Sequence, residues 1–411
     1  MWACQAALRP SRPSPLYAAW AAGAAYEIRL SLVGSEMCIR DRPQGLGPLV
    51  EHVTGLGMQF GLWVEPEMVN PDSDLFRAHP DWLLQVPGRE PPTWRHQQVL
   101  DLAHLDCFDH LLGRLDALLS EYDITYLKWD HNRDLVDPGR DGGRPGVRAQ
   151  TLAFYRLLDD LRARHPGVEI ETCASGGGRI DLGVLARTDR VWASDTIDPL
   201  ERQHIQRWTG LLLPPEVVGS HVAGGVSHTT GRRHSLGFRA ATAVFGHLGI
   251  EWDLTRLTAV ERAHLTGAVA AYRSLRPLLH AGVTVRSDEL DESALLHGVV
   301  SPTGDEAVYC YVQLSSSPTE APVAVTLPGL RDSTRYAVRL LPVGGNPSTQ
   351  QVQPPPWTRS GITLDGRSLR TVGLRLPVLH PEQALILQLT RLPEGPVPAD
   401  IGGGLTPPRT P

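Results

Sequence analysis

The chain has 411 residues, 41% of them hydrophobic, and a formal net charge of -6, so it can form a sizeable core and more than one domain. The basic residues form no stripe, which argues against a nucleic-acid-binding protein, and no run of apolar residues is long enough to predict a membrane span. The cysteines are odd in number and widely scattered, which favours reduced thiols and a cytoplasmic protein over a disulfide framework.

Residues 1–43 do not fit the pattern of the rest of the chain. Leu16–Tyr26 (LYAAWAAGAAY) has the character of a signal-peptide core, but no clear cleavage site follows it. Leu30–Arg42 (LSLVGSEMCIRDR) resembles a peptide that arises when sequencing-adapter DNA is translated. We therefore expect residues 1–43 to be non-native or unstructured, and the chain to be a piece of a longer protein.

From Gly45 onward, helix-like and strand-like runs alternate. The helical period of apolar residues predicts helices over Gly45–Gly57, Leu105–Tyr122, Thr151–Gly167, Glu201–Leu213 and Ser235–Gly246. Strand-like runs lie near residues 58–65, 125–130, 168–173, 190–195, 216–221 and 247–251. This alternation predicts a parallel (β/α)8 TIM-type barrel over residues 44–284, with about six of its eight strands present and the other two expected upstream.

From about residue 285 the pattern changes to short β-rich runs broken by Gly, Pro and Ser. The runs are ALLHGVVS, AVYCYVQL, APVAVTLPGL, TRYAVRLLPV and QALILQLTRL. They predict a small antiparallel β domain over residues 285–390. The Pro- and Gly-rich residues 391–411 are expected to be a disordered tail.

Catalytic residues of such barrels lie at the carboxyl ends of the strands. Those ends carry Trp63, Glu65, Glu67, Lys128, Asp130, Cys173, Gly176, Trp192, Asp195, His221, Glu251 and Asp253. Two carboxylates on separate strands suit glycoside hydrolysis, because one can attack the anomeric carbon while the other, initially protonated, releases the leaving oxygen. Tryptophan faces can pack on sugar C–H groups, and Lys or Arg can donate hydrogen bonds to hydroxyls.

Lys128 is the only lysine in a chain whose other basic residues are arginines. It lies two residues before Asp130, so both side chains point to the same side of the strand. We hypothesise that the ammonium of Lys128 donates to a sugar hydroxyl and helps to keep Asp130 ionised. A bulkier, planar guanidinium could not replace it freely.

Six blocks stand in the order that they have in bacterial α-galactosidases of glycoside hydrolase family 36. They are GLWVEPEMVNPDSDLFRAHPDWLL, RHQQVLDL, YLKWDHNRDL, ETCASGGGRIDLGVL, RVWASDTIDPLERQHIQ and PEVVGSHV. From about Gly45 to residue 390 the chain closely resembles this family. The resemblance implies a retaining α-galactosidase that hydrolyses terminal α-linked galactose from oligosaccharides such as melibiose and raffinose, with no cofactor.

The resemblance also implies roles for single residues. Asp130 matches the family's nucleophile and Asp195 its acid/base. The expected substrate-binding residues are Trp63, Arg95, Lys128, Cys173, Gly176 and Trp192, and the small Gly176 is expected to leave room for the sugar. The family also has a pair of galactose-binding aspartates on an upstream strand and an N-terminal β-sandwich domain, and residues 1–43 match neither.

Other interpretations stay open. Asp195 or Asp198 could cap the helix that opens near Pro199. Glu65 and Glu67 are interpreted as structural ion-pair partners and left out of the catalytic set. The Cys173 thiol has no suitably spaced histidine partner for nucleophilic catalysis. The histidines at 204, 221, 228 and 234 lack metal-ligand spacing, so we expect no metal.

Rival functions also stay open. On the same scaffold they are α-N-acetylgalactosaminidase and raffinose-type galactosyl transferase, and outside it a non-catalytic sugar-binding protein. Linkage preference and a homo-oligomeric full-length form are left undecided.

Overall fold

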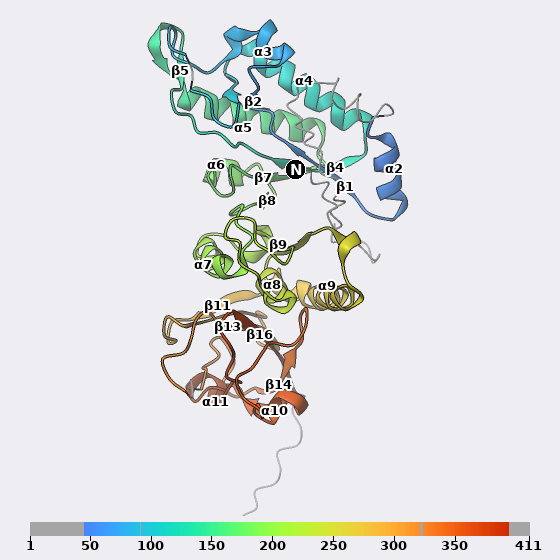
Figure 1. Ribbon diagram of the computed structural model, residues 1–411, viewed down its shortest axis with the longest axis vertical. Helices are drawn as coiled ribbons and strands as arrows, with labels where there is room; N and C mark the ends of the chain where they lie inside the picture. Colours follow the sequence, from blue (N-terminus) through green and yellow to red (C-terminus); the bar gives the residue numbers. More distant parts are fainter. Residues whose placement is uncertain (1–44, 91, 321–323, 394–411) are drawn as a thin grey trace, which may run out of the picture. The chain divides into compact units, whose positions relative to one another are not determined.

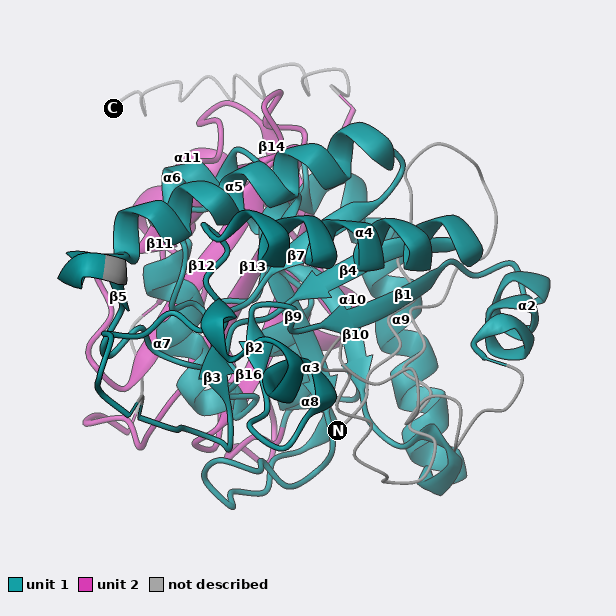
Figure 2. Cartoon of the chain, turned by 90° about the horizontal axis from the view of Figure 1, so that it is seen from above, with its two compact units in different colours: residues 1–280, 342–347 teal, residues 281–341, 348–411 magenta. Residues whose placement is uncertain are grey.

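The computed structural model describes residues 45–90, 92–320 and 324–393. Contacts divide the chain into two compact units, shown in different colours in Figure 2. The first unit comprises the chain up to His280 together with Pro342–Pro347, and the second comprises Ala281–Leu341 and the chain from Ser348 onward. The N-terminal segment 1–43 that the sequence set apart lies outside the described residues.

The first unit is built on parallel strands (Figure 1). The four-stranded sheet β1-β4-β7-β8 and the pair β10-β9 consist of β1 Phe60–Val64, β4 Ile124–Trp129, β7 Glu169–Thr172, β8 Arg190–Val191, β9 Gly219–Ala223 and β10 His247–Glu251. A parallel bridge from Val191 to Val218 links the two groups. Strand order therefore follows chain order, as in a (β/α)8 barrel. These are the predicted strands, although the one expected at 216–221 begins and ends a few residues later.

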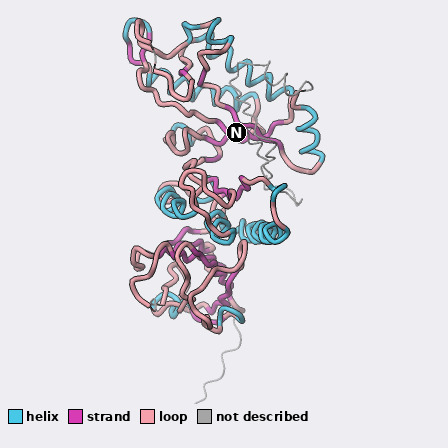
Figure 3. The backbone as a smooth tube through the Cα atoms, viewed as in Figure 1, coloured by secondary structure: helices cyan, strands magenta, loops and turns pink. Residues whose placement is uncertain are grey.

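Helices alternate with the strands along the chain. Figure 3 distinguishes helices, strands and loops by colour. The helices are α2 Gly47–Gly55, α3 Asp74–Ala78, α4 Leu105–Glu121, α5 Val147–Arg164, α6 Leu182–Leu185, α7 Pro199–Thr209, α8 Leu236–Ala243 and α9 Ala259–Leu279. Short additions are β2 Met68–Val69 paired with β3 Gln98–Val99, β5 Gly139–Arg140 paired with β6 Arg144–Pro145, and the 3-10 turns Pro80–Trp82, Asp141–Gly143, Pro215–Val217 and Leu254–Arg256. Among the described residues, no helix has the length and apolar character needed to cross a membrane.

The sequence analysis did not predict α9, although a capping box marks its start. The Thr258 hydroxyl accepts the backbone N–H of Glu261 at 3.2 Å, and the Glu261 carboxylate accepts the backbone N–H of Thr258 at 2.9 Å. This reciprocal pair satisfies two N–H groups that the first turn of a helix leaves free.

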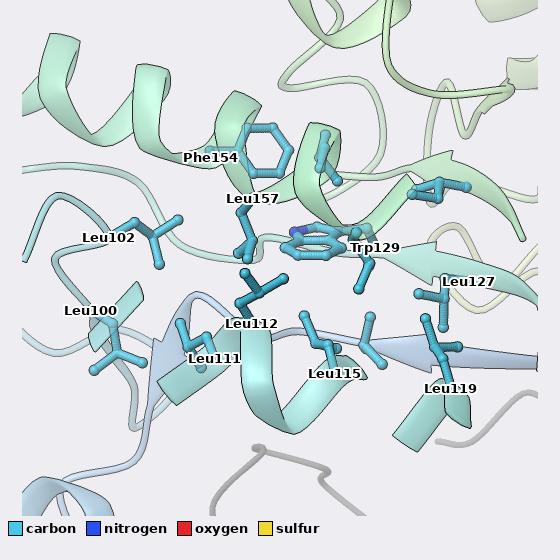
Figure 4. Close-up of a cluster of buried hydrophobic side chains, with 14 of the residues drawn as sticks. Leu100, Leu102, Leu111, Leu112, Leu115, Leu119, Leu127, Trp129, Phe154 and Leu157 are labelled. Atoms are coloured by element: carbon cyan, nitrogen blue, oxygen red, sulfur yellow. The ribbon is translucent and has the colours of Figure 1, made fainter. Parts of the chain in front are cut away.

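The core of the first unit lies between the sheet and helices α4 and α5 (Figure 4). Trp129, 1% exposed, points from β4 to the helices, and its ring centroid lies 5.6 Å from that of Phe154 in α5. Leu111 and Leu115 of α4 join the same cluster. The side chains of β4 that alternate with this apolar face, Tyr126 and Lys128 among them, point to the other side of the sheet.

The second unit is a six-stranded antiparallel sheet of order β11-β12-β13-β16-β14-β15. The strands are β11 Val283–Ser287, β12 Ala294–Val300, β13 Glu306–Gln313, β14 Arg335–Leu341, β15 Ile362–Asp365 and β16 Gln383–Arg391, with short helices α10 Trp357–Ser360 and α11 Gly366–Thr371. The sequence analysis predicted an antiparallel β domain here, and the sheet is antiparallel. It did not predict strands β11 and β15.

Two local predictions for this second unit were wrong. APVAVTLPGL forms no regular strand in its described part, where Val325 makes only an isolated bridge to Leu374. Its two prolines and its glycine interrupt a strand ladder, which explains the difference. In addition, β16 includes Arg391, which the prediction placed in the disordered tail, and residues from 394 lie outside the described part.

We expect the first unit to lose stability as the pH falls below about 6.5. Burial, reinforced by nearby Arg190, lowers the pKa of His247 to about 2, and burial with Arg276 lowers that of His280 to about 4. The unfolded chain binds protons there below its ordinary histidine pKa of about 6.5, whereas the folded chain does not. The free energy of unfolding is therefore at its full value above pH 6.5 and falls as the pH drops towards 4. Thermal unfolding midpoints measured from pH 4 to 8 check this.

His247→Gln should flatten this acid dependence, because a glutamine does not titrate. His52→Gln, which replaces an exposed histidine of α2, is the matched control and should leave the slope unchanged. Equal slopes in both variants would contradict the assignment to His247.

Candidate active site

Asp130 directly follows β4 and is 6% exposed. Its Oδ2 accepts hydrogen bonds from Trp63 Nε1 at 3.0 Å and from Asn132 Nδ2 at 2.7 Å. Its Oδ1 accepts the backbone N–H of His131 at 2.8 Å. All three partners are N–H donors, so this arrangement fixes the orientation of the side chain and suits an ionised carboxylate.

Asn132 links Asp130 to the loops on either side, and the sequence analysis did not single it out. Its backbone N–H donates to Glu65 Oε1 at 2.8 Å, and Ser175 Oγ donates to its Oδ1 at 3.1 Å. Glu65 Oε2 accepts from Gln97 Nε2 at 2.8 Å. Burial raises the pKa of Glu65, and the hydrogen bonds from Gln97 and Asn132 offset part of this rise. Within the described residues Glu65 has no cationic partner, so its interpretation as half of an ion pair was wrong.

Glu67 does form the structural ion pair that the sequence analysis expected. Its Oε1 accepts from Arg179 Nη1 at 2.9 Å and from Trp129 Nε1 at 2.9 Å, with the glutamate 1% exposed. Burial would raise the pKa of Glu67, but the charge of Arg179, together with His131 and the hydrogen bonds from Trp129 and Arg179, lowers it below the ordinary value. The pair therefore connects the loop after β7 to the segment after β1, and the hydrogen bond from Trp129 connects the same glutamate to the end of β4.

Lys128 lies on the inner side of β4, where its ionic partner is Glu171 of β7. Nζ stands 3.1 Å from Glu171 Oε1 and 4.3 Å from the centroid of the Trp192 ring. The Tyr126 hydroxyl donates to the other oxygen of Glu171 at 2.5 Å. Burial would lower the pKa of Lys128, but Glu171, and to a lesser extent Asp130, raise it above the ordinary value. Lys128 is therefore a cation held close to Asp130 mainly by Glu171, a residue that the sequence analysis missed.

Asp195 lies in the loop after β8 and is exposed. Its Oδ1 accepts one hydrogen bond, from Trp192 Nε1 at 3.0 Å. The N-cap of α7 is Asp198, which accepts the backbone N–H groups of Leu200 and Glu201 at 2.9 and 3.3 Å. Since Asp198 performs the capping, Asp195 is left available for another role.

Cys173 and Gly176 lie in the loop after β7. Burial raises the pKa of the Cys173 thiol, and Asp130 and Asp195 both act in the same direction, so the thiol is within electrostatic range of both carboxylates and stays protonated. Gly176 has a φ of +86°, and a Cβ there would lie 2.6 Å from the Cα of Ser194. The glycine is thus required by the close approach of the backbone next to Asp195.

Arg95 is the predicted site residue that the structure does not bring into contact with the others. It is exposed, with a φ of +55°, in a turn closed by backbone hydrogen bonds between Trp94 and Gln97. Gln97 connects this turn to Glu65. In the described part of the chain, no cluster of three or more His, Cys, Asp or Glu side chains could hold a metal ion.

Comparison with known proteins identifies the family of this chain. The Melibiase family model matches residues 26–282, and the model of the glycosyl hydrolase family 36 C-terminal domain matches residues 294–389. The chain belongs to the melibiase family. The match begins inside the segment 1–43, whose structure is not described.

An α-galactosidase of Escherichia coli is 46% identical over 355 residues, which cover 85% of this chain and 50% of that protein. The crystal structure of the family 36 α-galactosidase AgaA from Geobacillus stearothermophilus superposes with a TM-score of 0.77 at 32% identity, covering 86% of this chain and 48% of AgaA. That of the α-galactosidase from Lactobacillus brevis superposes with a TM-score of 0.78 at 31% identity, covering 87% and 48%. The predicted resemblance and the barrel fold class are thereby confirmed. The chain spans about half the length of the relatives that it matches.

We expect the Lys128–Glu171 pair to be a major contributor to the stability of the melibiase unit. Glu171→Gln leaves the buried ammonium of Lys128 without its ion-pair partner, which should lower the free energy of unfolding by about 3 kcal/mol. The double variant Lys128→Met/Glu171→Gln removes that charge as well and should recover part of the loss. Urea unfolding of both variants measures the difference.

The matched control is Asp159→Asn, which breaks a pair between Arg187 Nη2 and Asp159 Oδ2 of 2.9 Å at the surface, where Asp159 is 52% exposed. Its cost should be about 0–1 kcal/mol. A loss in Glu171→Gln no larger than in this control would show that the buried pair contributes little.

Proposed function

We propose that the protein to which this chain belongs is a retaining α-galactosidase, with Asp130 as the nucleophile and Asp195 as the acid/base. The observation that carries the proposal is the contrast between the two strand-end carboxylates. Asp130 is buried and oriented by three N–H donors, whereas Asp195 is exposed and has a single donor. A retaining glycosidase needs one carboxylate that stays ionised and one that can exchange a proton with the leaving group and with water.

In the proposed reaction, a carboxylate oxygen of Asp130 bonds to the anomeric carbon while the bond to the leaving oxygen breaks. The Asp195 carboxyl donates its proton to that oxygen. In the second step Asp195 takes a proton from water, the water oxygen attacks the anomeric carbon, and Asp130 is released. Lys128, held by Glu171 at 3.1 Å on the same face of β4 as Asp130, presents an ammonium for a sugar hydroxyl.

The relatives support the substrate class. The curated relatives are described as α-galactosidases, and variants of Geobacillus stearothermophilus AgaA have been crystallised with raffinose and with stachyose. We propose oligosaccharides with terminal α-linked galactose as substrates here. Trp63, Arg95, Cys173, Gly176 and Trp192 remain proposed contributors to the sugar-binding pocket, and a cytoplasmic location rests on the scattered cysteines alone.

The first test of the proposal is the configuration of the product. Hydrolysis of an aryl α-galactoside, followed by proton NMR, should give α-galactose before mutarotation, because two inversions at the anomeric carbon restore its configuration. The assay uses residues 1–411 beside a version extended upstream to the length of the relatives.

Asp130→Asn should abolish this turnover, since an amide cannot form the galactosyl-enzyme. Asp134→Asn, at an exposed residue of the same loop, is the matched control and should keep it. β-Galactose as the first product would refute the mechanism. Tight binding of galactosides without turnover in either length of the protein would favour a sugar-binding protein instead.

The second test concerns the acid. Asp195→Ala should reduce kcat/KM for melibiose at least tenfold more than for an aryl α-galactoside, about 1.4 kcal/mol of extra barrier, because only a poor leaving group needs protonation. Steady-state kinetics on the two substrates give the ratio.

Asp198→Asn is the matched control for this second test, because asparagine caps helices as well as aspartate does. It should change both substrates equally. If Asp198→Asn rather than Asp195→Ala altered the ratio, the acid would be assigned to the wrong aspartate.

A further inference from the structure

The loop that carries Asp195 runs from the end of β8 at Val191 to the start of α7 at Pro199. Asp195 itself is exposed, and its carboxylate has one hydrogen bond within the described residues, from Trp192. An acid that protonates a leaving group must nevertheless lie within hydrogen-bond reach of it. Some other group must therefore hold this loop in place.

Arg202 of α7 contacts the backbone on both sides of Asp195. Its Nε donates to the carbonyl oxygen of Thr196 at 2.6 Å, and its Nη2 donates to that of Ser194 at 2.5 Å. The fork of one guanidinium thus holds the two carbonyls that flank the aspartate, without touching its carboxylate.

The same guanidinium packs on the residue that binds the carboxylate. The Cζ atom of Arg202 lies 4.4 Å from the centroid of the Trp192 ring, and Trp192 Nε1 donates to Asp195 Oδ1 at 3.0 Å. A cation at this distance over an indole face is attracted by the ring. Arg202 therefore constrains Asp195 through the loop backbone and through the tryptophan.

Arg202 is not arranged like a cation placed for stability alone. It is 3% exposed, forms no ion pair with any described carboxylate, and its Nη1 has no hydrogen-bond partner there. Burial lowers its pKa to about 10, only partly offset by the more distant charges of Glu251 and Asp195. Burying a cation without a counter-charge is costly. Its strong contacts all end on the Asp195 loop and on Trp192.

We propose that Arg202 is a positioning residue that holds Asp195 in the orientation needed for proton transfer to the leaving group. The inference rests on the proposed acid/base role of Asp195. It assigns to Arg202 no contact with the sugar, and it predicts a defect confined to the acid-dependent part of the reaction.

The test uses Arg202→Met, which removes the charge and the fork but keeps the side-chain stem, and Arg202→Lys, which keeps the charge but cannot span both carbonyls. Arg239→Met is the matched control. Arg239 of α8 is 6% exposed, donates to the carbonyl of Ala223, and lies 4.6 Å from the Trp252 ring, so it has the same kind of surroundings on a different helix. Both Met variants should lose similar thermal stability.

The first readout is kinetic. Arg202→Met should lower kcat/KM for melibiose at least tenfold more than for an aryl α-galactoside, as expected for Asp195→Ala, and Arg202→Lys should fall between it and the wild type. Arg239→Met should leave the ratio of the two substrates unchanged. An equal loss on both substrates in Arg202→Met, or the same change of ratio in Arg239→Met, would overturn the proposal.

The second readout does not depend on turnover. In nitrogen-15 NMR spectra of tryptophan-labelled protein, the Trp192 indole N–H signal, assigned with Trp192→Phe, reports its hydrogen bond to Asp195. Arg202→Met should shift this signal towards its position in Asp195→Ala, and Arg239→Met should not. An unshifted signal in Arg202→Met would overturn the proposal. If the wild type cleaved no α-galactoside, the proposed function would fail while this spectrum still decided the role of Arg202.

Discussion

The two-residue repeat of β4 is the constraint on which the rest of the melibiase unit depends. On one face Leu127 and Trp129 belong to the apolar core that packs on α4 and α5. On the other face Lys128 precedes Asp130, with Tyr126 one step earlier. A shift of register by one residue would put the lysine and the aspartate into the apolar layer. The register of β4 therefore determines both the packing of the helices and the placement of the charges.

Two buried carboxylates beside this strand each have a cationic partner. Glu171 forms an ion pair with Lys128 and accepts a hydrogen bond from the Tyr126 hydroxyl. Glu67, in the segment after β1, forms an ion pair with Arg179. Burial by itself disfavours every one of these charges, so each position is stable only while its partner is present. This is why the raised pKa of Lys128 cannot be attributed to Asp130 alone. The largest contribution that favours its charged form comes from Glu171 of β7.

The sequence predicted the parallel strands and the antiparallel domain, because the period of apolar residues is a local property of the chain. Strand-end position predicted a set of polar residues, from which the family resemblance selected the two candidate carboxylates. The sequence did not predict the contacts that join distant segments. Glu171 appeared only as one residue of a strand, and Arg202 as one residue of a helix. Nothing in the spacing of either residue shows which neighbour it meets. The sequence analysis predicted that Gly176 leaves room for the sugar. In the structure, the atom that a side chain at Gly176 would meet first belongs to the backbone of Ser194, nearly twenty residues away in the chain.

Those non-local contacts form a series from one strand-end loop to the next. Glu65 after β1 accepts the N–H of Asn132 after β4, and Asn132 accepts Ser175 Oγ after β7. The loop after β7 lies against Ser194 at Gly176, and Arg202 binds the carbonyl of Ser194. The relative position of the two aspartates is therefore set by this series of neighbouring loops, since no direct contact joins them among the described residues. A change in one loop must act on the opposite carboxylate through the loops between them, so residues of the intermediate loops can affect the reaction without contacting the sugar.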